Sequence, residues 1–287
     1  MSNLRTYINW MLNDYCTSEC SYCPIRLRGG EQPRGILEYM AVTQKIIDHY
    51  DALGRKIDWA FSGGEPLDMF DFPMMLKLCK ERGGTIDLTT NGGKLWMDWW
   101  AIEPHIDYLH LTYHYWQNPK LIKFIIQTFQ KAKKEIHIVS PVRPDHFDED
   151  IARISEMESE CEIQIGKSIL YNEADPIGGM FPYTEQQLRI IRGEELVQVQ
   201  QYFKETTLEE RYENKIEENP VYTGYLCNAG IEKLIISHQG WVAGSSCNDK
   251  PLGNLWSPTF QLPSAPHRCG MRACVDNADQ KITKFNL

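Results

Sequence analysis

Residues 7–24 read YINWMLNDYCTSECSYCP, an apolar run followed at once by three closely spaced cysteines. The run from Tyr7 to Leu12 is rich in aromatic and aliphatic residues, which predicts a buried β-strand. Cys16, Cys20 and Cys23 follow it in the pattern C-x3-C-x2-C. Three thiolates at this spacing can hold three irons of a 4Fe-4S cluster and leave the fourth iron open. An open iron indicates a reactive centre, because a structural metal site fills its positions with protein ligands.

A zinc site or a set of unrelated buried thiols is the alternative interpretation of these cysteines. Zinc would require a fourth Cys or His nearby, and neither follows within the next dozen residues. The spacing therefore favours an iron-sulfur cluster. A non-enzymatic scaffold, in which both cysteine groups of the chain hold zinc, is kept as the minor alternative.

Composition and charge exclude several classes of protein. The chain has 287 residues, 42% of them hydrophobic, and a formal net charge of -9, which argues against bulk binding of nucleic acid. It contains no run of 18 or more apolar residues and no signal peptide at its start, so we expect a cytoplasmic protein with no membrane partner. In that compartment the nine cysteines should be reduced thiols, and the clustering of seven of them in two groups indicates metal ligation rather than disulfides.

The chain up to about residue 167 alternates short β-rich runs with amphipathic helical stretches, which predicts repeated βα units around a parallel sheet. Six such units would form a curved sheet whose loops gather at the C-terminal ends of the strands. The cysteine loop follows the first strand and so falls at that edge. The expected strands are Tyr7 to Leu12, Ile57 to Phe61, Thr85 to Thr89, Tyr108 to Tyr113, Ile136 to Val142 and Glu162 to Lys167.

The remainder of the chain divides into a bridge and a C-terminal part. A loop rich in Gly and Pro spans residues 171–182, and a charged helical stretch spans about 184–218. Residues 231–244 predict a β-hairpin with its turn at Gln239-Gly240. We therefore expect three parts, which are residues 1–182, 183–224 and 225–287.

Two glycine-containing segments follow predicted strands. Ser62-Gly63-Gly64-Glu65-Pro66 comes directly after the second strand, and Thr89-Thr90-Asn91-Gly92-Gly93 closes the third. Consecutive glycines let a ligand approach the backbone without a side chain in the way. An ordinary turn is the alternative. The position of the first segment beside the cysteine loop favours ligand binding.

Taken together, the cysteine motif, Tyr22 before the third cysteine, Gly-Gly-Glu-Pro after strand two and Thr-Asn-Gly after strand three closely resemble the radical S-adenosylmethionine (SAM) superfamily. The resemblance covers about residues 6–167. It implies an α/β fold, a partial (βα)6 barrel of the TIM type, in which Cys16, Cys20 and Cys23 hold the first 4Fe-4S cluster. The amine and carboxylate of SAM would chelate the open iron.

The same resemblance implies a set of residues that contact SAM. The Gly-Gly-Glu segment would hold the methionine part, Tyr22 would lie along the adenine through its backbone, and Thr112 and Ser140 would meet the ribose or the carboxylate. The expected cofactor-binding residues are Tyr22, Ser62, Gly63, Gly64, Glu65, Asn91, Thr112 and Ser140.

Four further cysteines lie near the C-terminus, at positions 227, 247, 269 and 274. The gaps between them are 19, 21 and 4 residues, which do not form the two tight pairs of a typical structural zinc site. With the hairpin between them, they resemble the small auxiliary-cluster domain called twitch, the shorter form of the SPASM domain. That resemblance implies a second 4Fe-4S cluster with the ligands Cys227, Cys247, Cys269 and Cys274.

The two remaining cysteines are expected to have no catalytic role. Cys79 lies on a predicted helix as a small buried hydrophobe, and Cys161 lies at the start of strand six, away from the active edge. Aromatic and polar residues after strands four and six predict a substrate pocket at the mouth of the barrel. His114 and Tyr171 are its candidate catalytic residues, with packing under loops as the alternative, and His114 is the better base.

The reaction implied by the resemblance is reductive cleavage of SAM to a 5'-deoxyadenosyl radical that removes a substrate hydrogen. An auxiliary cluster that accepts an electron favours a net oxidation, carried out by an oxidoreductase or maturase on a peptide or protein side chain. Dehydrogenation of a small molecule such as a sugar, an aminocyclitol or a cofactor precursor is the alternative. The expected partners are an electron donor such as flavodoxin or ferredoxin and, because no leader-binding domain of about 80 residues precedes strand one, a separate peptide-recognition protein.

Overall fold

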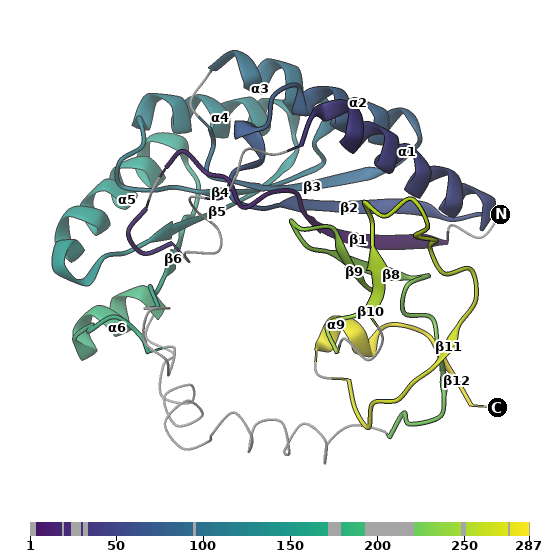
Figure 1. Ribbon diagram of the computed structural model, residues 1–287. Coiled ribbons are helices and arrows are strands. Elements are labelled where there is room, and N and C mark those ends of the chain that lie inside the picture. Colours follow the sequence, from purple (N-terminus) through teal and green to yellow (C-terminus); the bar gives the residue numbers. More distant parts are fainter. Residues whose placement is uncertain are drawn as a thin grey trace.

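One long curved sheet with helices across its convex face dominates the computed structural model (Figure 1). The structure describes residues 4–18, 20–23, 30, 34–93, 96–171, 179–192, 221–247, 251–274 and 276–286. In these ranges the sheet has nine strands, in the order β10, β9, β8, β1, β2, β3, β4, β5, β6. All neighbours from β8 to β6 are parallel, whereas β9 and β10 are antiparallel additions at one edge.

The first six strands alternate with helices, as the sequence predicts. The α/β class with a mostly parallel sheet, consistent with a partial barrel, is confirmed. The strands are β1 Arg5–Met11, β2 Lys56–Ser62, β3 Thr85–Thr90, β4 Tyr108–Thr112, β5 Glu135–Pro141 and β6 Gly166–Ser168. The helices between them are α1 Ile36–Ala52, α2 Phe72–Glu81, α3 Trp96–Ile102, α4 Pro119–Ala132 and α5 Phe147–Cys161.

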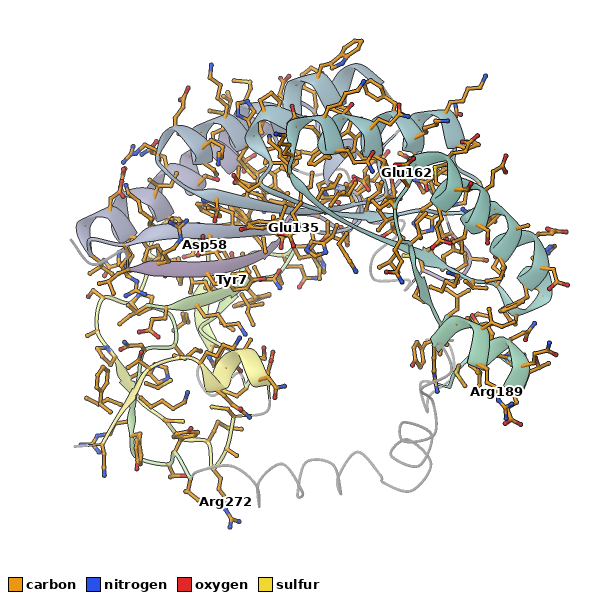
Figure 2. The ribbon with its side chains drawn as sticks, turned by 180° about the vertical axis from the view of Figure 1, so that it is seen from behind. Tyr7, Asp58, Glu135, Glu162, Arg189 and Arg272 are labelled. Atoms are coloured by element: carbon orange, nitrogen blue, oxygen red, sulfur yellow. The ribbon has the colours of Figure 1, made fainter. Side chains whose placement is uncertain are left out.

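The sixth strand begins later than predicted. Helix α5 continues to Cys161, and Glu162 ends it in the left-handed conformation, with φ of 51° (Figure 2). The amide of Ile163 then donates to the carbonyl oxygen of Glu158 at 3.3 Å, so the helix cap occupies residues predicted to be strand. Cys161 is therefore a buried residue at the end of a helix and not the first residue of a strand. Cys79 is fully buried on α2, as predicted.

Along the inner strands, successive side chains alternate between the face covered by helices and the open, concave face of the sheet. Trp10, Trp59 and Phe61 are at most 1% exposed and pack under the helices, where the rings of Trp59 and Phe61 stack with their centroids 5.5 Å apart. Tyr7 and Asp58 are register partners on the opposite face and lie side by side in Figure 2. The concave face of the sheet therefore carries polar groups, which is the surface that a barrel turns toward its ligands.

The predicted C-terminal hairpin is present and extends the main sheet. Its strands are β8 Lys233–Ile236 and β9 Trp241–Ala243, and β10 Pro251–Asn254 pairs with β9. Gly240 has a φ of 83° in the predicted turn. Strand β8 pairs in parallel with β1, so the hairpin and the βα units share one sheet.

A second, three-stranded sheet in the described C-terminal residues consists of β11 His267–Arg268, β7 Leu226–Cys227 and β12 Lys284–Phe285, next to the short helix α9 Asn277–Gln280.

Helix α6 Glu185–Arg192 begins the predicted helical bridge. The rest of that bridge, residues 193–220, lies outside the described residues, and the division into three parts stays a prediction. Among the described helices, none combines the length and the apolar character that a membrane span requires.

Candidate cluster and cofactor site

The loops after β1 and β2 pack backbone against backbone at the C-terminal edge of the sheet. The amide of Gly64 donates to the Asn13 carbonyl oxygen at 2.7 Å, and the amide of Glu65 donates to that of Tyr15 at 2.9 Å. A Cβ on Gly64 would stand 2.2 Å from the Tyr15 carbonyl oxygen, and one on Gly63, whose φ is +154°, would stand 2.7 Å from that of Asn13. The two glycines therefore allow the cysteine loop to lie against the second strand.

Glu65 ties this pair of loops to the loop after β3. Its Oε1 accepts hydrogen bonds from the Leu67 amide at 2.9 Å and the Thr90 hydroxyl at 2.6 Å, and its Oε2 accepts one from the Asn91 amide at 2.8 Å. The residue is 1% exposed, and this burial raises its pKa to about 7 against the lowering effect of the three donors. Both carboxylate oxygens are thus engaged by the protein itself.

The substitution Glu65→Gln should destabilise the protein by about 1–3 kcal/mol at pH 8. The reason is that the glutamine NH2 would face one of the buried donors, so that neither of these two donor groups would have an acceptor. Denaturant unfolding of the metal-free protein measures this. Glu38→Gln, on an exposed part of α1, is the matched control and should cost less than about 0.5 kcal/mol. Equal stability of the two variants would contradict the proposed role of the carboxylate.

The pH dependence of stability provides a second readout for the same residue. The folded-state pKa of Glu65, about 7, lies above the ordinary value of 4.5, so the folded protein binds more protons than the unfolded chain between these values. Wild-type stability should therefore fall as the pH rises from 4.5 toward 7. Glu65→Gln should lack this part of the decline.

N–H groups point at the thiols of Cys16 and Cys20. The Sγ of Cys16 lies 3.4 Å from the Ser18 amide and 3.8 Å from Nδ2 of Asn91. The Sγ of Cys20 accepts from Nε1 of Trp116 at 3.2 Å. Donors of this kind surround metal-bound thiolates and stabilise their charge. Two of these donors, Asn91 and Trp116, are far from the cysteines in sequence and lie on the loops after β3 and β4.

The predicted ligands meet in one cavity of about 270 Å³ at the C-terminal edge of the sheet. The cavity contains the three thiols, the Gly-Gly-Glu segment and residues from the ends of β3 and β4. Its lining residues are Cys16, Ser18, Cys20, Tyr22, Cys23, Gly63, Gly64, Glu65, Thr89, Thr90, Asn91, Thr112 and His114. Ten of the residues that the sequence assigns to the cluster, the cofactor or catalysis are thereby brought together.

Three other predicted site residues do not line this cavity. Ser62 is the last residue of β2. Ser140 is fully buried, where its hydroxyl donates to the Tyr113 carbonyl oxygen at 2.7 Å and accepts from Arg153 at 2.9 Å. Tyr171 is 50% exposed at the start of the predicted Gly- and Pro-rich loop. Roles for these residues in binding or catalysis stay predictions.

His114 reaches the cavity as part of an aromatic wall. Its Nδ1 lies 2.7 Å from the Tyr22 hydroxyl, and its ring stacks on Trp116 with centroids 5.4 Å apart. Burial, assisted by the positive charge of Arg153, lowers the pKa of His114 to about 4. The imidazole is therefore neutral near pH 7, and it is a weaker base than the unperturbed side chain that the sequence analysis assumed.

A histidine and an aspartate on the inner face were missed by the sequence analysis. Nε2 of His110 lies 3.2 Å from Oδ2 of Asp87, whose carboxylate raises the pKa of His110. These residues precede Thr112 and Thr89 of the cavity by two positions, so they share its face of the sheet. The sequence signal was available, because β3 and β4 carry a polar or hydroxyl-bearing residue at every second position of otherwise apolar strands.

The four C-terminal cysteines lie in one neighbourhood. Cys227 on β7 and Cys269 just after β11 pack together in a small buried cluster. Burial is the main cause of the raised pKa values of Cys227 and Cys274. The neighbouring thiols of Cys269 and Cys274 raise the pKa of Cys227 further. In the same way, Cys247 raises the pKa of Cys274. Thiols from three separate segments of the chain thus affect the pKa values of Cys227 and Cys274.

Asp279 on α9 links this group of thiols to the main sheet. Its Oδ2 accepts from the Cys247 amide at 3.1 Å, and its carbonyl oxygen lies 3.7 Å from Sγ of Cys274. The same carbonyl oxygen accepts from Nζ of Lys284 at 2.8 Å, whereas Oδ1 accepts from Nζ of Lys233 on β8 at 2.7 Å. Lys233 and Asp279 are 6% and 1% exposed, so the link is a buried ion pair.

The N-terminal donor set suits a cluster better than a single ion. Within the described ranges, no three His, Cys, Asp or Glu side chains are placed to hold one metal ion. In a 4Fe-4S cluster each cysteine binds a different iron, which requires thiols around a shared space rather than around one point. Cys16, Cys20 and Cys23 meet that requirement, because all three line one cavity that also presents N–H donors to the sulfurs.

The structure has a curved parallel sheet with three cysteines after its first strand and a glycine-rich loop after its second. This arrangement is typical of barrel proteins that hold a metal–sulfur cluster. The family model described as the Radical SAM superfamily matches residues 10–157, slightly more than half of the chain. The chain belongs to this superfamily, whose members bind SAM and an iron-sulfur cluster. No curated protein sequence matches the chain.

Solved structures are similar to the chain at low sequence identity, and those of SuiB share its fold. SuiB of Streptococcus suis bound to S-adenosylmethionine is 14% identical with a TM-score of 0.53, over 90% of this chain and 65% of SuiB. SuiB bound to the precursor peptide SuiA gives the same identity and TM-score, over 90% of this chain and 64% of that one. Native anSMEcpe with bound AdoMet is 14% identical with a TM-score of 0.49, over 89% of this chain and 79% of that one. The chain spans slightly less than two thirds of SuiB.

Proposed function

We propose that the chain is a radical SAM enzyme that carries out a net oxidation of a peptide or protein side chain. The observation that carries the proposal is the cavity of about 270 Å³ in which Cys16, Cys20 and Cys23 meet the Gly-Gly-Glu segment. When bound there, the cluster and SAM would supply a 5'-deoxyadenosyl radical that takes hydrogen from an unactivated carbon.

The residues of the chain have defined tasks in this proposal. The backbone of Gly63 and Gly64 borders the cavity without side chains, so the methionine part of SAM can approach it. Glu65 holds the three loops in register through its hydrogen bonds. Tyr22 and His114 form an aromatic wall that would exclude water and stray hydrogen donors from the radical.

An auxiliary 4Fe-4S cluster on Cys227, Cys247, Cys269 and Cys274 is the second element of the proposal. The packing of Cys227 with Cys269, together with the effect of neighbouring thiols on the pKa values of Cys227 and Cys274, supports a shared site. A fully ligated cluster there would accept the electron that a substrate radical must lose, which favours net oxidation over a redox-neutral rearrangement.

The fold neighbours favour a peptide substrate, since SuiB binds its precursor peptide SuiA. Modification of a small molecule, such as dehydrogenation of a sugar, an aminocyclitol or a cofactor precursor, is the alternative. A low-potential donor such as flavodoxin or ferredoxin would supply the electron, and a separate protein would present the peptide.

Mass spectrometry of the reaction separates these two substrate classes. Protein purified anaerobically with its bound small peptides and metabolites is incubated with SAM and reductant. The proposal expects a peptide that loses two hydrogen atoms, together with 5'-deoxyadenosine. A small molecule that loses two hydrogens while the peptides remain unchanged would replace the peptide proposal with its alternative.

A further inference from the structure

The loop after β4 brings an indole N–H to a cluster thiol. Nε1 of Trp116 lies 3.2 Å from Sγ of Cys20, across 96 residues of sequence. Trp116 is held there by its stacking on His114, with an interplanar angle of 10°. His114 is in turn held by its 2.7 Å contact to the hydroxyl of Tyr22, inside the cysteine loop. The indole is therefore oriented by the same loop whose sulfur it contacts.

This contact differs from the other N–H donors at the thiols. One donor to Cys16 is the backbone amide of Ser18, which is part of the cysteine loop itself. The second is Asn91, whose Nδ2 is 3.8 Å from the sulfur and also donates to the Ser18 hydroxyl at 3.2 Å. Of the N–H···S contacts described at these thiols, the shortest is the one from Trp116.

We propose that Trp116 is a positioning residue that raises the reduction potential of the N-terminal cluster by donating its indole N–H to the sulfur of Cys20. Reduction adds negative charge to a cluster and its thiolates, so a fixed donor stabilises the reduced form more than the oxidised form. The indole itself is half-buried. The proposal rests on the cluster of the superfamily and is independent of the substrate.

The test is an EPR-monitored redox titration of reconstituted wild type and Trp116→Phe, with no substrate present. The cluster of interest is the one whose signal SAM perturbs. In Trp116→Phe the ratio of reduced to oxidised cluster at a fixed solution potential should fall about tenfold, which corresponds to a midpoint about 59 mV lower for one electron. Trp100→Phe is the matched control, because Trp100 lies on α3 with 66% exposure, and its potential should equal that of wild type.

A second variant keeps the test decisive if Trp116→Phe loads iron poorly. Incorporation of benzothienylalanine at position 116 replaces the indole N–H by sulfur and keeps the shape and stacking of the ring. The proposal expects the same lowering of the potential with a full iron content. A fully loaded isostere variant with the wild-type potential would overturn it. Because no turnover is measured, this outcome is distinct from a failure of the proposed function, which would appear as absence of 5'-deoxyadenosine in wild type.

Discussion

Replacing Gly64 by alanine should empty the N-terminal cluster site. The added Cβ would stand 2.2 Å from the carbonyl oxygen and 2.6 Å from the carbonyl carbon of Tyr15. Both are backbone atoms, so no flexible side chain can yield, and the cysteine loop must move away from the second strand. A displacement of about 1 Å at a reacting centre can cost about a hundredfold in rate, and we expect at least that loss in 5'-deoxyadenosine formation.

Iron analysis after anaerobic reconstitution measures the same change directly. Gly64→Ala should hold about four fewer irons per chain than wild type, the content of one 4Fe-4S cluster. Gly35→Ala is the matched control, because no atom lies within 4 Å of a Cβ at Gly35. Full iron content and full activity in Gly64→Ala would show that the backbone contact between the two loops does not hold the cluster loop in place.

Replacing Cys227 by alanine should remove the auxiliary cluster and leave the first one. Iron per chain should fall from about eight to about four. Cleavage of SAM without substrate should persist, because Cys16, Cys20 and Cys23 line the cavity at the C-terminal edge of the sheet and none of the C-terminal cysteines is among its lining residues. Net oxidation of substrate should be lost, since its electron acceptor is gone.

Cys161→Ala serves as the control for this experiment. Cys161 is also buried, but it ends α5 with its thiol next to the sulfur of Met157 and belongs to neither cysteine group. Its replacement should leave the iron content unchanged. An unchanged iron content in Cys227→Ala as well would contradict the auxiliary cluster.

The strand pattern and the cysteine motif were predictable because both are local in sequence. Cys16, Cys20 and Cys23 lie within eight residues on one loop, so their spacing alone restricts the metal they can hold. Ile57, Trp59 and Phe61 alternate with the smaller or polar residues Asp58 and Ala60 and so mark a strand with one buried face. Parallel strands then bring the loops after β1, β2 and β3 to one edge of the sheet.

Contacts between distant segments were not predictable from these patterns. The parallel pairing of β8 with β1 joins residues more than 220 positions apart, and no local periodicity encodes it. The engagement of Glu65 by three donors and the contact of Trp116 with Cys20 depend on how loops fold over one another. The start of β6 was missed because Ile163 and Ile165 mimic strand alternation while Glu162 caps the preceding helix.

The central claim is that the cavity at the C-terminal edge of the sheet cleaves SAM. The most direct measurement is anaerobic reduction of the reconstituted protein with SAM, followed by chromatography for 5'-deoxyadenosine. We predict that 5'-deoxyadenosine forms with wild type and is absent with the triple variant Cys16→Ala/Cys20→Ala/Cys23→Ala. Equal amounts from both proteins, or none from wild type that holds its full iron and binds SAM, would contradict the claim.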